Sequence, residues 1–255
     1  MPTPTAASTH LAIVTGASRG LGHAVARSLL RPGMRLLTLS RRATALPTVP
    51  DATHEDWTVD LADSAPVAAR LATWLAAQSS AELASIRLVH NAATLGGPGT
   101  LDHVPIDELV TAARVNLEAP LVLSAAFLRA TAAWPGRRQV LFISSGLGRQ
   151  AMAGAAPYCA TKAGLDHLAR ALALEEAARP NGAGVVSLAP GVIDTDMQVQ
   201  LRGADPAHFA ARSRFVSLHE GGQLLSPEAA AARVLAYLER PNFGQQPVAD
   251  VRDPA

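Results

Sequence analysis

A tyrosine and a lysine stand four residues apart in this chain, at Tyr158 and Lys162. Lys162 is the only lysine among 22 lysines and arginines, so we expect a role there that arginine cannot fill. Positions i and i+4 share one face of a helix, which would bring the ammonium beside the phenol. A nearby positive charge favours the phenolate, and a tyrosine so placed can transfer a proton near neutral pH. The alternative is a surface pair on a helix with no chemical role.

A glycine-rich turn follows the first apolar run of the chain, Leu11-Ala12-Ile13-Val14, and precedes a helical pattern. The order strand, glycine turn, helix aims backbone N–H groups at a phosphate, and glycine permits its close approach. An ordinary turn between a strand and a helix is the alternative. The candidate phosphate site consists of Gly16, Ala17, Ser18, Arg19, Gly20, Leu21 and Gly22.

The second predicted strand, residues 34–39, ends at Ser40, Arg41 and Arg42. An acidic residue at this point of a dinucleotide-binding unit would bind the 2′-hydroxyl of the adenosine ribose. Two guanidinium groups would instead bind a 2′-phosphate, and Arg19 can add a third contact. We therefore expect NADP rather than NAD as the cofactor, with a solvated pair of arginines as the alternative.

Polar or small residues also follow the later predicted strands, which cover residues 56–59, 86–89, 140–143 and 185–188. Ligands of open α/β sheets gather at the carboxyl ends of the strands, so these residues are candidates for a binding site. The alternatives are a helix cap for the aspartate and turn formation for the asparagine and the serine. The candidates are Asp60 and Leu61, Asn91, Ser145 and Gly146, and Pro190, Gly191, Ile193, Thr195 and Met197.

Strands and helical patterns alternate about seven times along the chain. This alternation predicts one parallel sheet with helices on both faces and right-handed crossovers. Two long helical patterns, residues 106–129 and 156–178, carry the Asn116 side chain and the tyrosine–lysine pair. Asn116 and Pro120 inside the first pattern predict a kink, with Asn116 bonding the freed backbone groups or a water.

The chain is expected to form one domain over residues 11–252, preceded by a disordered tail of residues 1–10. The polar segment from about residue 195 to 225 contains Gly221-Gly222 and is expected to be a mobile lid over the substrate. A net charge of +1 gives no basis for binding nucleic acid or an acidic membrane.

The single cysteine, Cys159, rules out an intramolecular disulfide and fits a reducing compartment. There is no apolar run of 18 or more residues and no signal-peptide pattern, so we expect a cytoplasmic protein. No metal site is predicted.

Taken in order, these motifs resemble the short-chain dehydrogenase/reductase family, and they cover most of the chain. TGASRGLG at 15–22 is similar to the cofactor loop of that family, and HNAA at 90–93 stands at its NNAG motif. Each motif alone is weak, whereas the ordered set is specific. The positions that match its adenine-contacting acid, its nicotinamide loop and its four catalytic residues are Asp60, Pro190-Gly191 with Thr195, and Asn116, Ser145, Tyr158 and Lys162.

The resemblance implies a doubly wound Rossmann fold whose seven parallel strands have the order 3-2-1-4-5-6-7. It also implies hydride transfer from NADPH to a ketone. Tyr158 would then give a proton to the developing alkoxide, and Ser145 would hold the carbonyl. Lys162 would lower the pKa of the phenol and bind the nicotinamide ribose, while Asn116 would hold a water that links Lys162 to solvent. The main chain of residues 191–197 would orient the nicotinamide. The two long helices imply a homodimer, with a homotetramer as the alternative.

A closer similarity is to the sepiapterin reductases and the bacterial benzil-type diketone reductases. It is carried by LxxSRR, ISSG, YCATKAGLD, ALALEE, PGVIDTDMQ and the ending QPVAD. It implies a vicinal dicarbonyl substrate, either a diketone or the side chain of a pterin. In the pterin enzymes an aspartate near the C-terminus binds the guanidine-like edge of the substrate, and Asp250 falls at the matching place. A solvated carboxylate is the alternative for Asp250.

The substrate would accordingly lie among Ser145, Gly146, Tyr158, Gly191 and Asp250. His90, Ala93 and the segment Arg149-Gln150-Ala151 depart from the family pattern, so the identity of the substrate stays open. Two other functions remain as alternatives: an NAD(P)-linked secondary alcohol dehydrogenase, and a non-catalytic regulator that binds NADP.

Overall fold

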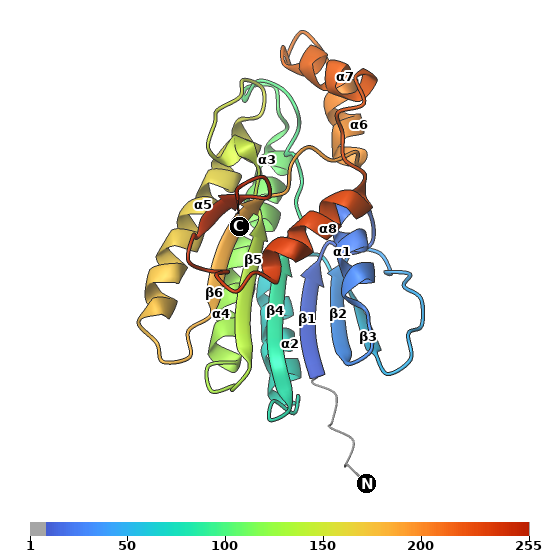
Figure 1. Cartoon of the computed structure of the whole chain (residues 1–255). Coiled ribbons are helices and arrows are strands. Elements are labelled where there is room, and N and C mark those ends of the chain that lie inside the picture. Colours follow the sequence, from blue (N-terminus) through green and yellow to red (C-terminus); the bar gives the residue numbers. More distant parts are fainter. Residues whose placement is uncertain (1–8, 255) are drawn as a thin grey trace.

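Seven parallel strands form one sheet in the order β3-β2-β1-β4-β5-β6-β7 in this computed structural model, which describes residues 9–254 (Figure 1). The order confirms the predicted doubly wound Rossmann fold. It reverses beside β1, and ligands bind at such a switch point, outside the carboxyl ends of the strands. The strands are β1 (Thr9–Thr15), β2 (Met34–Ser40), β3 (Thr53–Thr58), β4 (Leu83–His90), β5 (Arg137–Ile143), β6 (Gly184–Ala189) and β7 (Val248–Asp250).

Helices cover both faces of the sheet, and each face has its own apolar core. In β1, Leu11 and Ile13 belong to the core under α2, α4 and α5, whereas Ala12 and Val14 belong to the core under α1 and α8 (Figure 1). Successive side chains of a strand point to opposite faces, so a run of apolar residues fills both cores. The helices are α1 (Gly20–Leu29), α2 (Ser64–Ala76), α3 (Ile106–Ala113), α4 (Ala119–Ala130), α5 (Ala156–Ala177), α6 (Asp196–Gly203), α7 (Arg212–Glu220) and α8 (Pro227–Leu238).

A single π-helical turn, Arg114–Glu118, joins α3 to α4, so the predicted helix over 106–129 is continuous but irregular at Asn116. The expectation that Asn116 bonds groups freed in its own helix is wrong, because its partners lie elsewhere, on Thr94 and Thr161. The whole segment Ile106–Ala130 is long and apolar enough to cross a membrane by length and composition alone. One face of it packs on the sheet, with Leu123 and Phe127 fully buried, whereas Ile106 and Leu121 are exposed.

Several boundaries differ from the sequence-based expectation, among them the starts of β1 and β3. β1 begins at Thr9, so the predicted tail of residues 1–10 extends too far; residues 1–8 lie outside the described residues. β3 begins at Thr53, three residues earlier than predicted, because the hydrogen bonds to β2 extend along residues whose side chains are largely polar. An edge strand with one solvated side gives a weak apolar signal.

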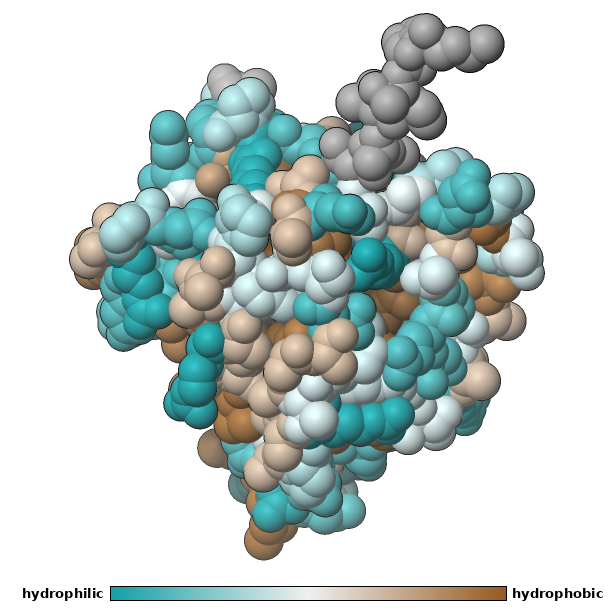
Figure 2. Space-filling view, turned by 90° about the horizontal axis from the view of Figure 1, so that it is seen from below, coloured by the Kyte–Doolittle hydropathy of each residue, from teal (hydrophilic) through white to brown (hydrophobic). Residues whose placement is uncertain are grey.

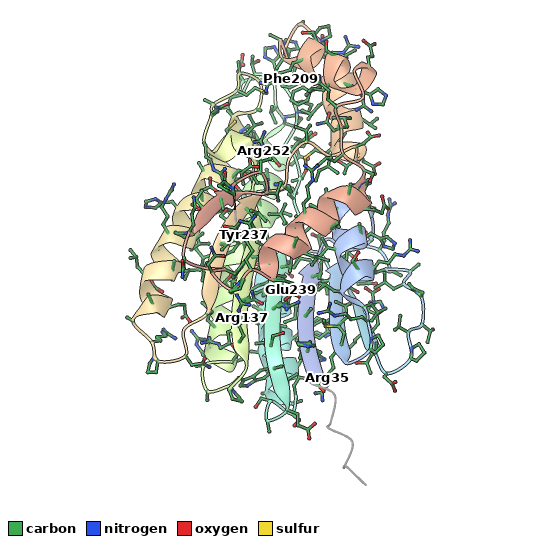
Figure 3. The ribbon with its side chains drawn as sticks, viewed as in Figure 1. Arg35, Arg137, Phe209, Tyr237, Glu239 and Arg252 are labelled. Carbon is green, nitrogen blue, oxygen red and sulfur yellow. The ribbon has the colours of Figure 1, made fainter. Side chains whose placement is uncertain are left out.

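The segment from 195 to 225, expected to be a polar insertion, contains the two helices α6 and α7. Their few apolar side chains converge, and Leu201, Phe209 and Phe215 form a small core with Leu95 and Tyr158. Figure 3 labels Phe209 at the top of the molecule, in the connection between the two helices. The segment is therefore structured and packs against the candidate catalytic tyrosine.

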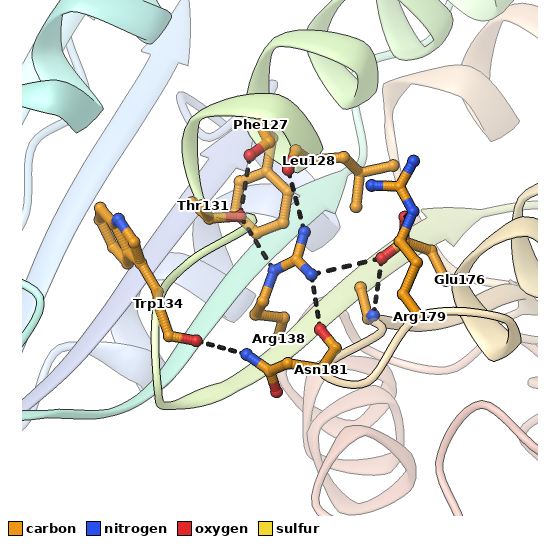
Figure 4. Close-up of polar contacts among 9 residues, drawn as sticks. Phe127, Leu128, Thr131, Trp134, Arg138, Glu176, Arg179 and Asn181 are labelled. Atoms are coloured by element: carbon orange, nitrogen blue, oxygen red, sulfur yellow. Dashed lines mark hydrogen bonds and ion pairs between the residues drawn. The ribbon is translucent and has the colours of Figure 1, made fainter.

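A buried arginine, Arg138, holds several elements together near the amino ends of the strands. The Arg138 guanidinium pairs with Glu176 at 3.3 Å and donates to the Thr131 hydroxyl and to the carbonyls of Leu128 and Asn181 (Figure 4). Both charged side chains are 1% exposed. The cluster joins β5 to the ends of α4 and α5 near the amino ends of the strands. The surface at that end mixes hydrophilic and hydrophobic residues (Figure 2). The candidate active site, described below, lies at the carboxyl ends of the strands.

Candidate active site

A cleft of about 1190 Å³ opens at the carboxyl ends of the strands and is large enough for a dinucleotide together with a small substrate. Nearly all residues predicted for the site line it; Ala17 and Asn116 do not. Ala17 is fully buried in the core under α1 and α8, so the prediction that it contacts the cofactor can hold only for its main chain. The predicted residues in the lining are Gly16, Ser18, Arg19, Gly20, Leu21, Gly22, Arg41, Arg42, Asp60, Leu61, Asn91, Ser145, Gly146, Tyr158, Lys162, Pro190, Gly191, Ile193, Thr195, Met197 and Asp250.

The glycine turn between β1 and α1 is packed too tightly for side chains. Gly16 has a φ of +68°, and a Cβ atom there would lie 2.8 Å from the Cα of Ala92. A Cβ on Gly22 would lie 2.3 Å from the carbonyl oxygen of Gly16. Glycine is thus required both by the left-handed backbone and by the close approach of the loop after β4. The turn presents backbone to the cleft at the N-terminus of α1, as an anion site needs.

Asn91, directly after β4, stabilises the glycine turn by hydrogen bonds. Its side-chain amide donates to the carbonyls of Thr15 and Gly16, each at 3.1 Å, and its backbone N–H donates to the Thr15 hydroxyl. The alternative of a simple turn residue therefore does not describe it. Asn91 lines the cleft and at the same time holds the shape of the glycine turn.

Three of the predicted arginines line the cleft. Arg41 and Arg42 follow β2 and are exposed at the cleft, as the sequence predicted. Arg19 lies in the glycine turn, but its guanidinium pairs with Asp196 at the start of α6, at 2.5 Å. The predicted third contact to a 2′-phosphate therefore competes with a carboxylate already in place.

Asp60 does not cap α2. Its carboxylate accepts a hydrogen bond from the Ala62 N–H at 2.9 Å, whereas Asp63 occupies the N-cap position without a side-chain bond. The Asp60 side chain is exposed on the lining of the cleft, and Leu61 beside it is buried in the core. The helix-cap alternative is thus wrong, and contact with a base remains open to Asp60.

Ser145 ends the loop after β5 and begins a short 3₁₀ turn, Gly146–Gly148. Its hydroxyl oxygen accepts a hydrogen bond from the Leu147 N–H at 3.2 Å, which fixes the side chain toward the cleft. A Cβ on Gly146 would meet no atom within 4 Å, so the cleft is open at this point. The Ser145 side chain also opposes the rise in the pKa of the Tyr158 phenol.

Tyr158 and Lys162 lie on one face of α5, as the spacing predicted, and both are buried. The Lys162 ammonium lies 5.5 Å from the centre of the Tyr158 ring and donates to the carbonyl of Ile143 at 2.7 Å. Burial raises the pKa of Tyr158 to about 12, and burial lowers the pKa of Lys162 to about 8. Burial is the largest cause of the shift at Tyr158. A lowering of the phenol pKa by Lys162 stays a prediction.

Asn116, in the π-helical turn, is fully buried and does not line the cleft. Its side chain accepts from the Thr94 N–H and donates to the Thr94 carbonyl, both at 2.8 Å, and donates to the Thr161 hydroxyl at 3.1 Å. Thr161 directly precedes Lys162. Asn116 thus ties the loop after β4 to the helix that carries the tyrosine and the lysine.

The loop after β6 forms the opposite wall of the cleft. Gly191 has a φ of +88°, and Ile193 pairs with Leu225 in an isolated β-bridge. Thr195 is the N-cap residue of α6, and its methyl group would lie 3.3 Å from a Cβ on Gly20. The loop and the glycine turn therefore face each other across a narrow gap, with Met197 on the lining beyond it.

Asp250, the predicted substrate residue, lies at the end of β7 on the lining of the cleft and is 7% exposed. Its two carboxylate oxygens accept from the Arg252 guanidinium at 2.7 and 2.6 Å. These hydrogen bonds are the main cause that lowers the pKa of Asp250. The alternative of a solvated carboxylate is wrong, because this carboxylate is buried and paired.

Sequence reasoning missed Asp166, a buried carboxylate one helical turn after Lys162. It accepts hydrogen bonds from the hydroxyls of Ser144 and Ser187, and it pairs with Arg149. The spacing of four residues from the only lysine was an available signal. Arg149 was noted only as a departure from the family pattern.

The chain is similar to known proteins over nearly its whole length. It is 32% identical to a benzil reductase ((S)-benzoin forming) from Bacillus cereus over 237 residues, which covers 91% of this chain and 95% of the relative. It is 32% identical to a sepiapterin reductase from Rattus norvegicus over 245 residues, covering 91% and 92%. A solved structure from Beutenbergia cavernae, assigned as an NAD(P)-dependent gluconate 5-dehydrogenase and holding NADP at low occupancy, superposes with a TM-score of 0.74 at 28% identity. That match covers 98% of this chain and 97% of the other.

The fold and the site define a nicotinamide-dependent oxidoreductase. A family model, short chain dehydrogenase, matches residues 10–205, and the chain belongs to this family. The residues present fit such a cofactor, since a bare glycine turn at a helix N-terminus suits a diphosphate and the arginines suit a further phosphate.

Proposed function

We propose that this protein is an NADPH-dependent carbonyl reductase that reduces one ketone of a vicinal dicarbonyl compound. The observation that carries the proposal is the convergence of Ser145, Tyr158 and Lys162 on one cleft beside the glycine turn. The similarity to a benzil reductase and to a sepiapterin reductase supports a carbonyl substrate. When bound, NADPH supplies the hydride; the task of the chain is to orient the reactants and to manage the proton.

Tyr158 is proposed as the proton donor to the carbonyl oxygen. With its pKa raised to about 12 by burial, the phenol holds its proton at neutral pH, as a general acid must before reaction. Ser145, on the lining of the same cleft, directs the carbonyl oxygen toward the phenol. Lys162, with its pKa lowered to about 8, can return a proton to the site near neutral pH. The Asn116 side chain forms hydrogen bonds with Thr94 and Thr161. We therefore propose that the main chain of Asn116, and not its side chain, binds the water that links Lys162 to solvent.

The preference for NADPH is proposed from Arg41 and Arg42. Both side chains are exposed at the cleft immediately after β2, where the 2′ position of an adenosine ribose would lie. Neither side chain has an ion-pair partner among the described residues, in contrast to Arg19. Two free guanidinium groups favour a phosphate over a hydroxyl.

The substrate class is proposed from the far end of the cleft. Leu147, Met152 and Phe215 line it there and suit apolar substituents. The carboxylate of Asp250 is already satisfied by Arg252, so this chain is less suited to a pterin edge than to a benzil-like diketone. Asp250 remains the proposed substrate residue if Arg252 moves away.

We also propose that α6 and α7 act as the lid over the substrate.

We propose further that the chain forms a homodimer, with a homotetramer as the alternative. Large apolar side chains stay exposed on the helices that the family resemblance assigns to the dimer, namely Ile106 at 78%, Leu121 at 49% and Leu174 at 77% exposed. Such side chains suit a face that a second copy covers.

The test follows the loss of NADPH with benzil, sepiapterin and a simple monoketone as substrates. We expect turnover of benzil, and a loss of kcat of about 100-fold or more in Tyr158→Phe and in Ser145→Ala. Tyr237→Phe is the matched control, since Tyr237 is the only other tyrosine and lies in the core under α1 and α8. Intact turnover in Tyr158→Phe would refute the assigned acid, tighter binding of NADH than NADPH would indicate an NAD-linked dehydrogenase, and binding without turnover would indicate a regulator.

A further inference from the structure

One buried carboxylate connects the serine and the lysine of the site. Asp166 is 2% exposed, and its Oδ1 atom accepts hydrogen bonds from the Ser144 hydroxyl at 2.6 Å and the Ser187 hydroxyl at 2.7 Å. Its Oδ2 atom accepts from Nε of Arg149 at 3.3 Å. Four elements of the chain meet at this one side chain: the end of β5, the turn after it, β6 and α5. None of the roles assigned above uses Asp166.

We propose that Asp166 is a positioning residue, which holds Ser145 in place from both sides and keeps the Lys162 side chain charged. The proposal rests on the proposed function only in taking Ser145 and Lys162 as the reacting residues. Asp166 itself does not line the cleft, so it acts through its neighbours.

Asp166 positions Ser145 through residues that lie on either side of it in the sequence. Ser144 precedes it and Arg149 ends the turn that follows it, and both bind the same carboxylate. A Cβ on Gly148 would lie 3.0 Å from Oδ2 of Asp166, so the 3₁₀ turn lies against this side chain. Arg149 also donates to the Ala249 carbonyl at 2.7 Å, which fixes the turn to β7. A shift of Asp166 would therefore displace the serine hydroxyl.

The effect on Lys162 is electrostatic. Lys162 is 2% exposed, and burial lowers its pKa to about 8, while the charge of Asp166 opposes this fall. The ammonium donates to a neutral carbonyl, that of Ile143. Asp166 is thus the acidic group that stabilises the charged lysine inside the protein.

Other charged groups on the elements around α5 are paired elsewhere or exposed. Asp250 on β7 pairs with Arg252, and Glu118 in the π-helical turn accepts from Ser64. Asp107 and Glu108 on α3 are exposed, and β6 offers only the Ser187 hydroxyl. On α5 itself the Tyr158 phenol stays protonated, with its pKa raised to about 12. Asp166 is therefore the charged group that acts on Lys162, and Arg149 pairs with its carboxylate from the turn.

The single lysine makes this balance measurable without any activity. Selective ¹³C labelling of lysine at Cε gives one side-chain resonance, and its titration reports Lys162 in the full chain. In Asp166→Asn we expect the midpoint to move to lower pH, by about one unit. In Arg149→Gln we expect it to move to higher pH, because the charge of Asp166 is no longer opposed. Glu175→Gln removes an exposed carboxylate from the same helix and is the matched control, with an unchanged midpoint.

Kinetics test the hold on Ser145. Asp166→Asn keeps an oxygen acceptor for the two serines, whereas Asp166→Ala removes it. We therefore expect kcat for the diketone below pH 7 to fall about tenfold further in the alanine variant, while KM for NADPH stays unchanged. Equal kcat values in the two variants would overturn the hold on the serine.

Lysine midpoints that do not move, or that move in the same direction in Asp166→Asn and Arg149→Gln, would overturn the electrostatic role. If Asp166→Ala does not fold, the other two variants still decide this point, and the kcat of Ser144→Ala against wild type decides the hold on the serine. If the wild-type protein reduces no diketone, the proposed function fails. The ¹³C titration still measures the effect of Asp166 on the pKa of Lys162, because it does not depend on activity.

Discussion

Arg252 holds the carboxylate of Asp250 with two parallel hydrogen bonds, Nε to Oδ1 at 2.7 Å and Nη2 to Oδ2 at 2.6 Å. The Arg252 side chain is 72% exposed, whereas that of Asp250 is 10% exposed. A planar N–H pair thus already occupies the edge of the carboxylate that a substrate with such a pair would use.

Removing this arginine is expected to change substrate preference. In Arg252→Ala, we expect kcat/KM for sepiapterin to rise at least about tenfold, because Asp250 becomes free to bind the pterin. The value for benzil, which has no N–H group, should stay within about twofold of wild type. Steady-state kinetics with both substrates measure this, and Arg233→Ala, on an exposed part of α8, controls for loss of a positive charge. An equal change for both substrates would show that Asp250 is not a selective contact.

The two arginines after β2 are expected to decide between the cofactors. Replacing Arg41 or Arg42 with alanine should raise the Kd for NADPH about tenfold for each residue and leave the Kd for NADH unchanged. Arg35→Ala is the control, because Arg35 lies at the opposite end of the same strand (Figure 3). Titration of cofactor fluorescence measures both constants. A similar loss of affinity for the two cofactors would assign these arginines to another phosphate.

A buried histidine is expected to make the protein sensitive to acid. His90 contacts the Ser124 hydroxyl at 2.9 Å and stacks on Phe142, and burial lowers its pKa to about 3. Below pH 6.5 the unfolded chain gains a proton that folded His90 takes up only near pH 3. Stability is therefore present above pH 6.5 and is lost as the pH falls toward 3.

In His90→Gln we expect the fall in the free energy of unfolding between pH 7 and pH 5 to shrink by about 2 kcal/mol. Urea unfolding at the two pH values measures it. His219→Gln, on the surface of α7, should leave the fall unchanged. If the His90 variant loses as much stability as wild type, another group causes the sensitivity.

The buried pair at the far end of the sheet is expected to matter for stability alone. Glu176→Ala leaves the Arg138 guanidinium buried without its carboxylate, and the backbone N–H of Ala183 loses the same acceptor. We expect a loss of about 3 kcal/mol or more in the free energy of unfolding. Glu175→Ala, the exposed neighbour, should change it by less than about 0.5 kcal/mol. Unchanged stability in Glu176→Ala would show that the other partners of Arg138 suffice.

The parallel sheet and the place of the cleft were predictable because the strands are apolar runs that end in polar or glycine residues, whereas the order of the strands was implied by the family resemblance. Where that contrast is weak, prediction failed. The helices α6 and α7 carry few apolar residues, and their core forms only with residues far away in the chain, such as Leu95. Likewise β3 lies at an edge and has largely polar side chains.

The residues of the site could be predicted from the sequence, whereas their pKa values and ion pairs could not. The four-residue spacing of Tyr158 and Lys162 predicts their shared face, but burial is a property of the folded chain, and it raises the pKa of the phenol instead of lowering it. In the same way Asp250 was identified by position, whereas its pairing with Arg252 depends on the turn that follows β7.

The burial of Lys162 has a practical side. No lysine amine is on the surface, because the only lysine of the chain is 2% exposed. Amine-directed cross-linkers, dyes and solid supports that are too large to enter the cleft are therefore expected to leave Lys162 unmodified. A small acylating reagent that enters the cleft would instead reach Lys162 as well.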